Sequence, residues 1–243
     1  MAKYGLIGNN IGYSFSKTFF TLKFEQENRE DSYHNFDISD INQLTEILKN
    51  NKDLKGLNVT IPFKESVIPF LDKIDKEAKN IGAVNTIRIN KKGKLKGYNT
   101  DNYGFAHALI ELFPIKEKKA LVLGTGGACK AINYVLKTMS FEITQVSRSQ
   151  KENTICYKDL NHKLISENLL IINCTPLGTF PNIQDFPDIP YEYLSKDHLA
   201  FDLTYNPRET QFMIRSEKNG ARVTNGLKML EYQAKRSLSI WDS

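Results

Sequence analysis

Residues 119–139 pass from a short apolar run through a glycine-rich turn into an amphipathic helix. Lys119-Ala120-Leu121-Val122-Leu123 predicts a buried strand, Gly124-Thr125-Gly126-Gly127-Ala128 the turn, and apolar residues at helical spacing from Ala128 to Met139 the helix. In this context glycines let a backbone approach a pyrophosphate, and the helix N-terminus offers N–H donors. The strict G-x-G-x-x-G pattern fails, because Cys129 stands at its third glycine. We predict dinucleotide binding here, with a plain tight turn as the alternative.

The rest of the chain repeats this alternation of strands and helices, which predicts an α/β fold. Its 243 residues are enough for two domains. In the first half, a β-α-β-α-β pattern predicts a mainly parallel sheet. The elements expected in this half are strands at Tyr4–Ile7 and Leu54–Val59, a helix over 16–27, a helix with Ser39 as N-cap, and a hairpin of Val84–Ile89 and Lys94–Tyr98. A connecting helix over Asn102–Leu112, closing at Pro114, is expected to follow. The second half is expected to add strands at Glu142–Val146, Leu169–Asn173 and Leu199–Leu203, a proline-rich loop between the last two, and a final helix over 227–238.

Composition excludes several classes of function. The net charge of +5 comes from scattered lysines, so we expect a small anionic ligand rather than nucleic acid, and Asn90–Lys96 is interpreted as a solvated hairpin turn. Three cysteines without C-x-x-C spacing argue against a disulfide framework or zinc site, and four histidines show no metal-ligand spacing. Without a long apolar segment or export signal, we expect a cytoplasmic protein that is not embedded in a membrane.

The segment after the next predicted strand indicates which dinucleotide binds. An NAD site carries Asp or Glu there to bond the ribose 2′-hydroxyl, but this chain has Ser147-Arg148-Ser149, followed by Lys151. Arg148 suits a 2′-phosphate and can stack on adenine. These residues favour NADP over NAD, with a solvated turn arginine as the alternative.

Two turns in the first half carry residues suited to proton transfer. Asn58-Val59-Thr60-Ile61-Pro62-Phe63-Lys64 ends a strand on a lysine, and Asn99-Thr100-Asp101 precedes a helix with an aspartate. Taken singly, Lys64 reads as a surface lysine and Asp101 as a helix N-cap. Ser14 and Ser16 offer two hydroxyls that would point the same way in an extended loop, although Ser16 as a helix N-cap is the favoured interpretation.

These motifs, taken in order, resemble the shikimate dehydrogenase family along nearly the whole chain. The resemblance is carried by Ser14-Phe15-Ser16, Asn58 to Lys64, Gly82-Ala83-Val84-Asn85-Thr86, Asn99-Thr100-Asp101, Gly124 to Ala128, Ser147-Arg148-Ser149, Asn173-Cys174-Thr175-Pro176-Leu177-Gly178, Asp202-Leu203-Thr204-Tyr205-Asn206-Pro207, and Gly226 through Met229-Leu230 to Gln233-Ala234. The lysine and glutamine motifs are the most specific of these. Departures from the family pattern include Lys228, Cys174 and Ser147.

The resemblance implies a reaction and a division of labour. A family member reduces 3-dehydroshikimate to shikimate with NADPH in aromatic amino acid biosynthesis, as a monomer or homodimer without a metal. A substrate domain would comprise residues 1–101 and 226–243, and a Rossmann-like NADP-binding domain residues 102–225. Lys64 and Asp101 would be catalytic, Ser14, Ser16, Thr60, Asn85, Tyr205 and Gln233 would bind substrate, and Gly124, Thr125, Gly126, Gly127, Ala128, Ser147, Arg148, Ser149, Thr175, Leu203, Gly226 and Met229 would bind cofactor.

Two other functions remain open. One is an NAD-preferring quinate/shikimate dehydrogenase, against which Ser147 and Arg148 argue. The other is a non-catalytic protein that senses a dinucleotide, since fold alone does not establish activity. Such a sensor has no need to keep both Lys64 and Asp101.

Overall fold

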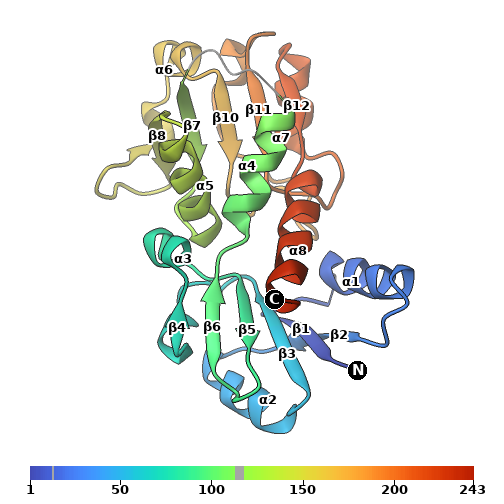
Figure 1. Cartoon of the computed structure of the whole chain (residues 1–243). Coiled ribbons are helices and arrows are strands. Elements are labelled where there is room, and N and C mark those ends of the chain that lie inside the picture. The colour runs from blue at the N-terminus through green and yellow to red at the C-terminus, as the bar shows by residue number, and fades with distance from the viewer. Residues whose placement is uncertain (13, 113–117) are drawn as a thin grey trace. The chain divides into compact units, whose positions relative to one another are not determined.

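The computed structural model describes residues 1–12, 14–112 and 118–243, which divide into two compact units (Figure 1). Unit 1 comprises Met1–Tyr103 and Gln233–Ser243, and unit 2 comprises Gly104–Tyr232. Helices α4 (Asp101–Leu112) and α8 (Leu227–Trp241) each contribute residues to both units. Pro114, where the sequence predicts the end of the connecting helix, lies outside the described residues.

Unit 1 is built on a six-stranded sheet of order β2-β1-β3-β5-β6-β4. Strand β1 pairs in parallel with β2 and β3, and β4 with β6, whereas β5 runs antiparallel to β3 and β6. The predicted α/β class is therefore confirmed, with a mixed sheet in this unit. The elements are β1 (Lys3–Gly8), α1 (Phe15–Gln26), β2 (Ser32–Asp37), α2 (Leu44–Asn50), β3 (Leu54–Val59), β4 (Lys73–Ile74), α3 (Lys76–Ile81), β5 (Thr86–Ile89) and β6 (Leu95–Tyr98).

An aromatic cluster attaches the end of α8 to this sheet. Trp241 stacks on Tyr4 with ring centroids 4.8 Å apart, and its indole N–H donates to the Ile87 carbonyl at 3.0 Å. Phe20 of α1 stacks on Tyr33 of β2 at 4.5 Å. The last helical turns therefore belong to the core of unit 1, although the chain reaches them only after passing through unit 2.

Two details of unit 1 differ from the sequence prediction. Asp40, not Ser39, caps the helical segment, and a 3₁₀ turn at Ile41–Gln43 precedes α2. The Asp40 carboxylate accepts from the Asn42 N–H at 2.9 Å, as an N-cap side chain does. The sequence does not place strand β2, because its polar Ser-Tyr-His-Asn-Phe-Asp run lacks a clear strand period.

Unit 2 is built on an all-parallel sheet of order β12-β11-β10-β7-β8-β9. This is the 3-2-1-4-5-6 order of the dinucleotide-binding fold, and the order reverses between β7 and β10. The predicted Rossmann-like architecture is confirmed. The elements are β7 (Lys119–Leu123), α5 (Gly127–Thr138), β8 (Glu142–Ser147), β9 (Ile155–Cys156), α6 (His162–Glu167), β10 (Leu170–Asn173), β11 (Leu199–Asp202), α7 (Gln211–Lys218) and β12 (Arg222–Thr224), together with most of α4 and the start of α8.

The central strands of unit 2 are buried on both faces. Leu121, Val122 and Leu123 of β7 and Ile171 and Ile172 of β10 are all fully enclosed. Continuous apolar runs are typical of parallel strands covered by helices on both sides. Among the described residues, no helix is long and apolar enough to cross a membrane.

Candidate active site

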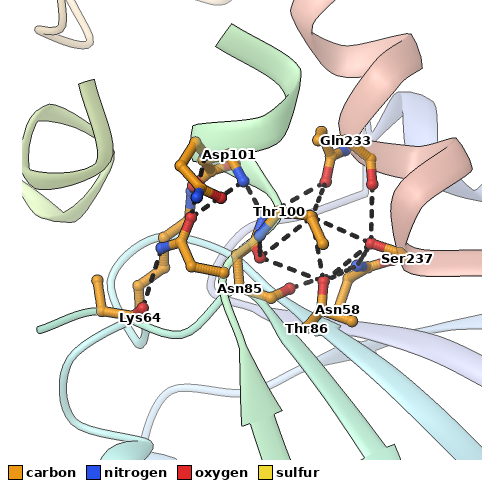
Figure 2. Close-up of polar contacts among 11 residues, drawn as sticks. Asn58, Lys64, Asn85, Thr86, Thr100, Asp101, Gln233 and Ser237 are labelled. Carbon is orange, nitrogen blue, oxygen red and sulfur yellow. Dashed lines mark hydrogen bonds and ion pairs between the residues drawn. The ribbon is translucent and has the colours of Figure 1, made fainter. Parts of the chain in front are cut away.

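Lys64 and Asp101 form a short, largely buried ion pair in unit 1 (Figure 2). Lys64 Nζ lies 2.6 Å from Asp101 Oδ2, and the two side chains are 14% and 8% exposed. The turn that carries Lys64 is anchored by the buried side chains of Phe63 and Val67. The interpretation of Lys64 as an ordinary surface lysine is wrong.

Asp101 is the first residue of α4 and is not its N-cap. The Asn99 side chain takes the cap position, because its Oδ1 accepts from the N–H groups of Asp101 at 3.0 Å and Asn102 at 3.2 Å. The Asp101 carboxylate is thereby available to other partners. Oδ2 accepts from Lys64, and Oδ1 accepts from Asn85 Nδ2 at 2.8 Å.

Asn85 connects this carboxylate to a wider polar network. Its Nδ2 also donates to Thr100 Oγ1 at 3.0 Å, and its Oδ1 accepts from the Thr100 N–H at 2.7 Å. The side chain is 3% exposed. Both ends of the amide are thus engaged within the protein, which orients Asp101 towards Lys64. Substrate contact by Asn85 stays a prediction.

Gln233 enters the network from α8. Its Oε1 lies 3.2 Å from Thr100 Oγ1 and 3.4 Å from Asn85 Nδ2, and both groups can donate to it. Within residues 1–12, 14–112 and 118–243, no group accepts from Gln233 Nε2. The geometry therefore turns the amide oxygen into the protein and leaves the amide nitrogen as a donor for a ligand.

Ser14 and Ser16 do not lie in an extended loop. Ser14 is the N-cap of α1, where its Oγ accepts from the Ser16 N–H at 3.2 Å, so the N-cap interpretation of Ser16 is wrong. Burial raises the pKa of Tyr33 well above its usual value, and the Ser16 hydroxyl opposes this shift. Tyr33 Oη donates to Asn58 Oδ1 at 2.8 Å, so Tyr33 belongs to the same network as Lys64.

Four buried members of this network were given no role by the sequence analysis: Asn58, Thr86, Thr100 and Ser237. Asn58 carries a detectable signal, because an amide within the apolar run Leu57-Asn58-Val59 must find partners inside the core. Ser237 carries none, since serines on a helix are most often solvated. Thr60 follows β3 and is partly exposed, and neither Thr60 nor Ser14 has a hydrogen bond to the network among the described residues.

Two glycines shape the glycine-rich turn of unit 2 before helix α5. Gly124 adopts φ +111°, and a Cβ there would lie 3.3 Å from the backbone carbon and oxygen of Cys174. Gly126 is the N-cap of the 12-residue helix α5 and has open space where a Cβ would stand. First-turn N–H groups without a side-chain cap are anion donors. Cys129, at the third motif position, is 1% exposed and donates its Sγ–H to the Gly124 carbonyl at 3.0 Å.

The end of β8 supplies a basic segment beside this turn. Ser147 is buried, Arg148 and Ser149 are exposed, and residues 147–151 contain no carboxylate. Lys151 Nζ donates to Thr125 Oγ1 of the glycine-rich turn at 3.1 Å. Positive charge at this strand end, without an acidic side chain to repel it, fits a 2′-phosphate.

Asp202 fixes the segments that carry Thr175, Leu203 and Tyr205. It accepts from Asn173 Nδ2 at 3.1 Å, from Thr204 N at 2.9 Å and from Thr210 Oγ1 at 2.6 Å. Burial raises the pKa of the Asp202 carboxyl, and these donors oppose the shift. The same network orients the Thr175 side chain, whose Oγ1 donates to Asn173 Oδ1 at 2.6 Å.

The beginning of α8 completes the predicted cofactor residues. Gly226 lies against the backbone of Leu203, since a Cβ on Gly226 would fall 2.1 Å from the Leu203 carbonyl oxygen. Met229 is 7% exposed and packs in the hydrophobic core of unit 2. Lys228 pairs with Glu111 of α4 at 3.3 Å on the surface. Its charge is therefore neutralised by a neighbouring helix.

Comparison with known proteins gives one consistent result. Residues 6–87 match the family profile of the shikimate dehydrogenase substrate binding domain. The NADP(+) shikimate dehydrogenase of Methanococcus maripaludis is 36% identical over 254 residues, covering 98% of this chain and 90% of that protein.

Solved structures agree. The shikimate dehydrogenase of Aquifex aeolicus superposes with a TM-score of 0.89 at 33% identity, covering 100% of this chain and 92% of that one. The enzyme from Thermus thermophilus, in complex with NADP(H) and shikimate, superposes with a TM-score of 0.87 at 30% identity over 99% of this chain and 93% of that one. By sequence, by sheet topology in both units and by full-length similarity, the chain belongs to the shikimate dehydrogenase family.

Proposed function

We propose that this protein catalyses the reversible, NADPH-dependent reduction of 3-dehydroshikimate to shikimate in the shikimate pathway. The observation that carries the proposal is the buried pair of Lys64 and Asp101, held at 2.6 Å within a polar network. Relatives named as NADP(+) shikimate dehydrogenases, of similar length, support the reaction. A merely structural ion pair has no need of the surrounding ligand-type donors.

Lys64 acts as the general acid in the direction of reduction. NADPH, when bound, supplies the hydride that adds to the ring ketone. Lys64 Nζ–H donates a proton to the carbonyl oxygen as negative charge develops there, and the ammonium stabilises that charge. In the reverse direction the neutral lysine accepts the hydroxyl proton. Asp101 orients Lys64, and Asn85 holds the other carboxylate oxygen.

The remaining donors of unit 1 bind the substrate. The hydroxyls of Ser14 and Ser16 bind its carboxylate. Thr60, Asn85 and Asp101 hydrogen-bond its ring hydroxyls. Gln233 offers its Nε2 to a ring hydroxyl; the proposal is supported by the inward direction of its Oε1, which accepts from Thr100. Tyr205 is a further substrate-binding residue.

Unit 2 holds the cofactor. The α5 N-terminus and Gly124 to Ala128 bind the pyrophosphate, and Ser147, Arg148 and Ser149 bind the adenosine 2′-phosphate. Thr175, Leu203, Gly226 and Met229 contribute on the nicotinamide side. Unit 1 is then the substrate domain, and the two segments where the chain passes between units lie within α4 and α8.

A spectrophotometric assay tests the proposal. Shikimate with NADP⁺ is expected to produce an absorbance increase at 340 nm, and kcat/KM for NADP⁺ should exceed that for NAD⁺. Quinate should be a poorer substrate than shikimate. Absence of any turnover, with NADP⁺ binding retained, would identify a dinucleotide sensor, and a preference for NAD⁺ and quinate would identify the alternative dehydrogenase.

A further inference from the structure

The hydroxyl of Ser237 joins helix α8 to the buried polar network of unit 1 (Figure 2). Its Oγ lies 2.8 Å from Thr86 Oγ1, 3.0 Å from Asn58 Nδ2 and 3.2 Å from Thr100 Oγ1. It also lies 3.0 Å from the backbone carbonyl of Gln233, one turn earlier on α8. The side chain is fully buried. One serine of α8 thus contacts three residues that lie outside this helix.

The chemistry of these partners fixes which way each hydrogen bond runs. A hydroxyl has one donor and two acceptor sites. The Gln233 carbonyl can only accept and Asn58 Nδ2 can only donate, so Ser237 donates to the carbonyl and accepts from Asn58. Its second acceptor site takes the Thr86 hydroxyl hydrogen across the shortest of these contacts, 2.8 Å.

This assignment determines the hydrogen bond that holds the Gln233 side chain. With the Thr86 hydrogen directed to Ser237, Thr86 no longer donates to Asn85 Oδ1 or to Thr100. Thr100 Oγ1 accepts from Asn85 Nδ2 at 3.0 Å and has one hydrogen to give. The two Asn85 Nδ2 hydrogens take their shorter contacts, to Thr100 Oγ1 and to Asp101 Oδ1 at 2.8 Å, so Gln233 Oε1 at 3.2 Å is left to accept the Thr100 hydrogen. Asn85 Oδ1 already receives the Thr100 N–H at 2.7 Å.

We propose that Ser237 is a positioning residue for the dehydrogenase reaction, which fixes the Gln233 amide with its oxygen inward and its Nε2 presented to the substrate. It acts on the Gln233 backbone through its own donated bond and on the Gln233 side chain through Thr86 and Thr100. The inference rests on the proposed function, because it assigns Gln233 to substrate binding. Ser237 itself does not touch the reacting atoms.

The chain provides a matched control for removal of this hydroxyl. Ser216 of α7 is also fully buried and also donates to the carbonyl four residues earlier, Phe212, at 2.7 Å. No other side chain among the described residues hydrogen-bonds Ser216. Ser216→Ala therefore reproduces the loss of a buried serine from a helix without disturbing the network.

Steady-state kinetics of purified full-length variants test the proposal. Ser237→Ala is expected to raise KM for shikimate about fivefold, the worth of one net hydrogen bond, with kcat and KM for NADP⁺ within about twofold of wild type. Ser216→Ala should leave all three unchanged. In a Gln233→Ala background, Ser237→Ala should change kcat/KM by less than about twofold, because its effect passes through Gln233.

Each other outcome overturns the inference. An equal loss in both backgrounds, or a loss matched by Ser216→Ala, would mean that Ser237 has a structural role only. If Ser237→Ala does not fold, Thr86→Val removes the Thr86–Ser237 hydrogen bond from the other partner. The inference would then be refuted if the effects of Thr86→Val and Gln233→Ala on kcat/KM were additive. Inactivity of the wild-type protein would instead refute the proposed function, so the two failures are distinguishable.

Discussion

Replacing Lys64 by methionine separates the structural role of the ion pair from its catalytic role. Methionine keeps the length and the apolar stem of lysine but removes the charge. Asp101, with a side chain 8% exposed, then keeps Asn85 as its one side-chain donor among the residues that the structure describes. Breaking a buried pair by removing one partner costs about 3 to 5 kcal/mol. We expect about 3 kcal/mol, since the bond from Asn85 remains.

A second substitution should recover stability without recovering activity. Asp101→Asn added to Lys64→Met removes the uncompensated charge, and we expect it to restore about 2 kcal/mol of the lost free energy of unfolding. For catalysis we expect kcat to fall by about 100-fold to 10,000-fold in both variants, the range for loss of a general acid. KM for shikimate should change far less than kcat.

The single tryptophan makes the stability measurement specific. Trp241 is the only tryptophan in the chain and is buried in the core of unit 1, so its fluorescence during urea unfolding follows the unit that carries Lys64. Turnover is followed at 340 nm under the same buffer conditions. Turnover of Lys64→Met within about fivefold of wild type would refute the assignment of Lys64 as the general acid. Failure of Asp101→Asn to restore stability would show that the charge on Asp101 is not the source of the loss.

Three further variants test other parts of the structure. Gly56→Ala should lower the unfolding free energy by about 1 to 3 kcal/mol in urea titrations, because its Cβ would fall 2.2 Å from the Trp241 indole nitrogen. Arg148→Glu should raise KM for NADPH by about 10-fold to 100-fold and leave that for NADH nearly unchanged; equal effects on both would contradict a 2′-phosphate contact. Tyr157 has a buried hydroxyl without a partner among the described residues, and burial raises its pKa from 10.0 to about 12. The Tyr157 hydroxyl therefore ionises at a lower pH in the unfolded chain than in the folded protein, so the unfolding free energy of the wild type falls as the pH rises through this interval. Tyr157→Phe should lose less unfolding free energy between about pH 8 and 11 in the same titrations.

Elements with strong local signals were predictable from the sequence. Lys119–Leu123 and Leu54–Val59 were predicted to the residue, because a buried strand is a compact apolar run bounded by turn residues. The short edge strands β9 and β12 were not predicted, since two or three residues carry no measurable period. Ser39 was predicted as the helix cap, but Asp40, one residue later, makes the capping hydrogen bond, because a sequence pattern does not resolve a helix end to a single residue.

The family resemblance, the α/β class and the two turns that carry Lys64 and Asp101 could be recognised before the fold was known, because these features depend on residues close together in the chain. The contacts of those residues depend on how the chain packs. Asn58 and Ser237 are 179 positions apart and meet only because α8 returns to the unit 1 sheet after the chain has built unit 2. A buried hydroxyl or amide must satisfy its hydrogen-bonding groups from whatever the fold brings near. The partners of Ser237, and the orientation they impose on Gln233, are therefore properties of the packed structure and have no local signal in the chain.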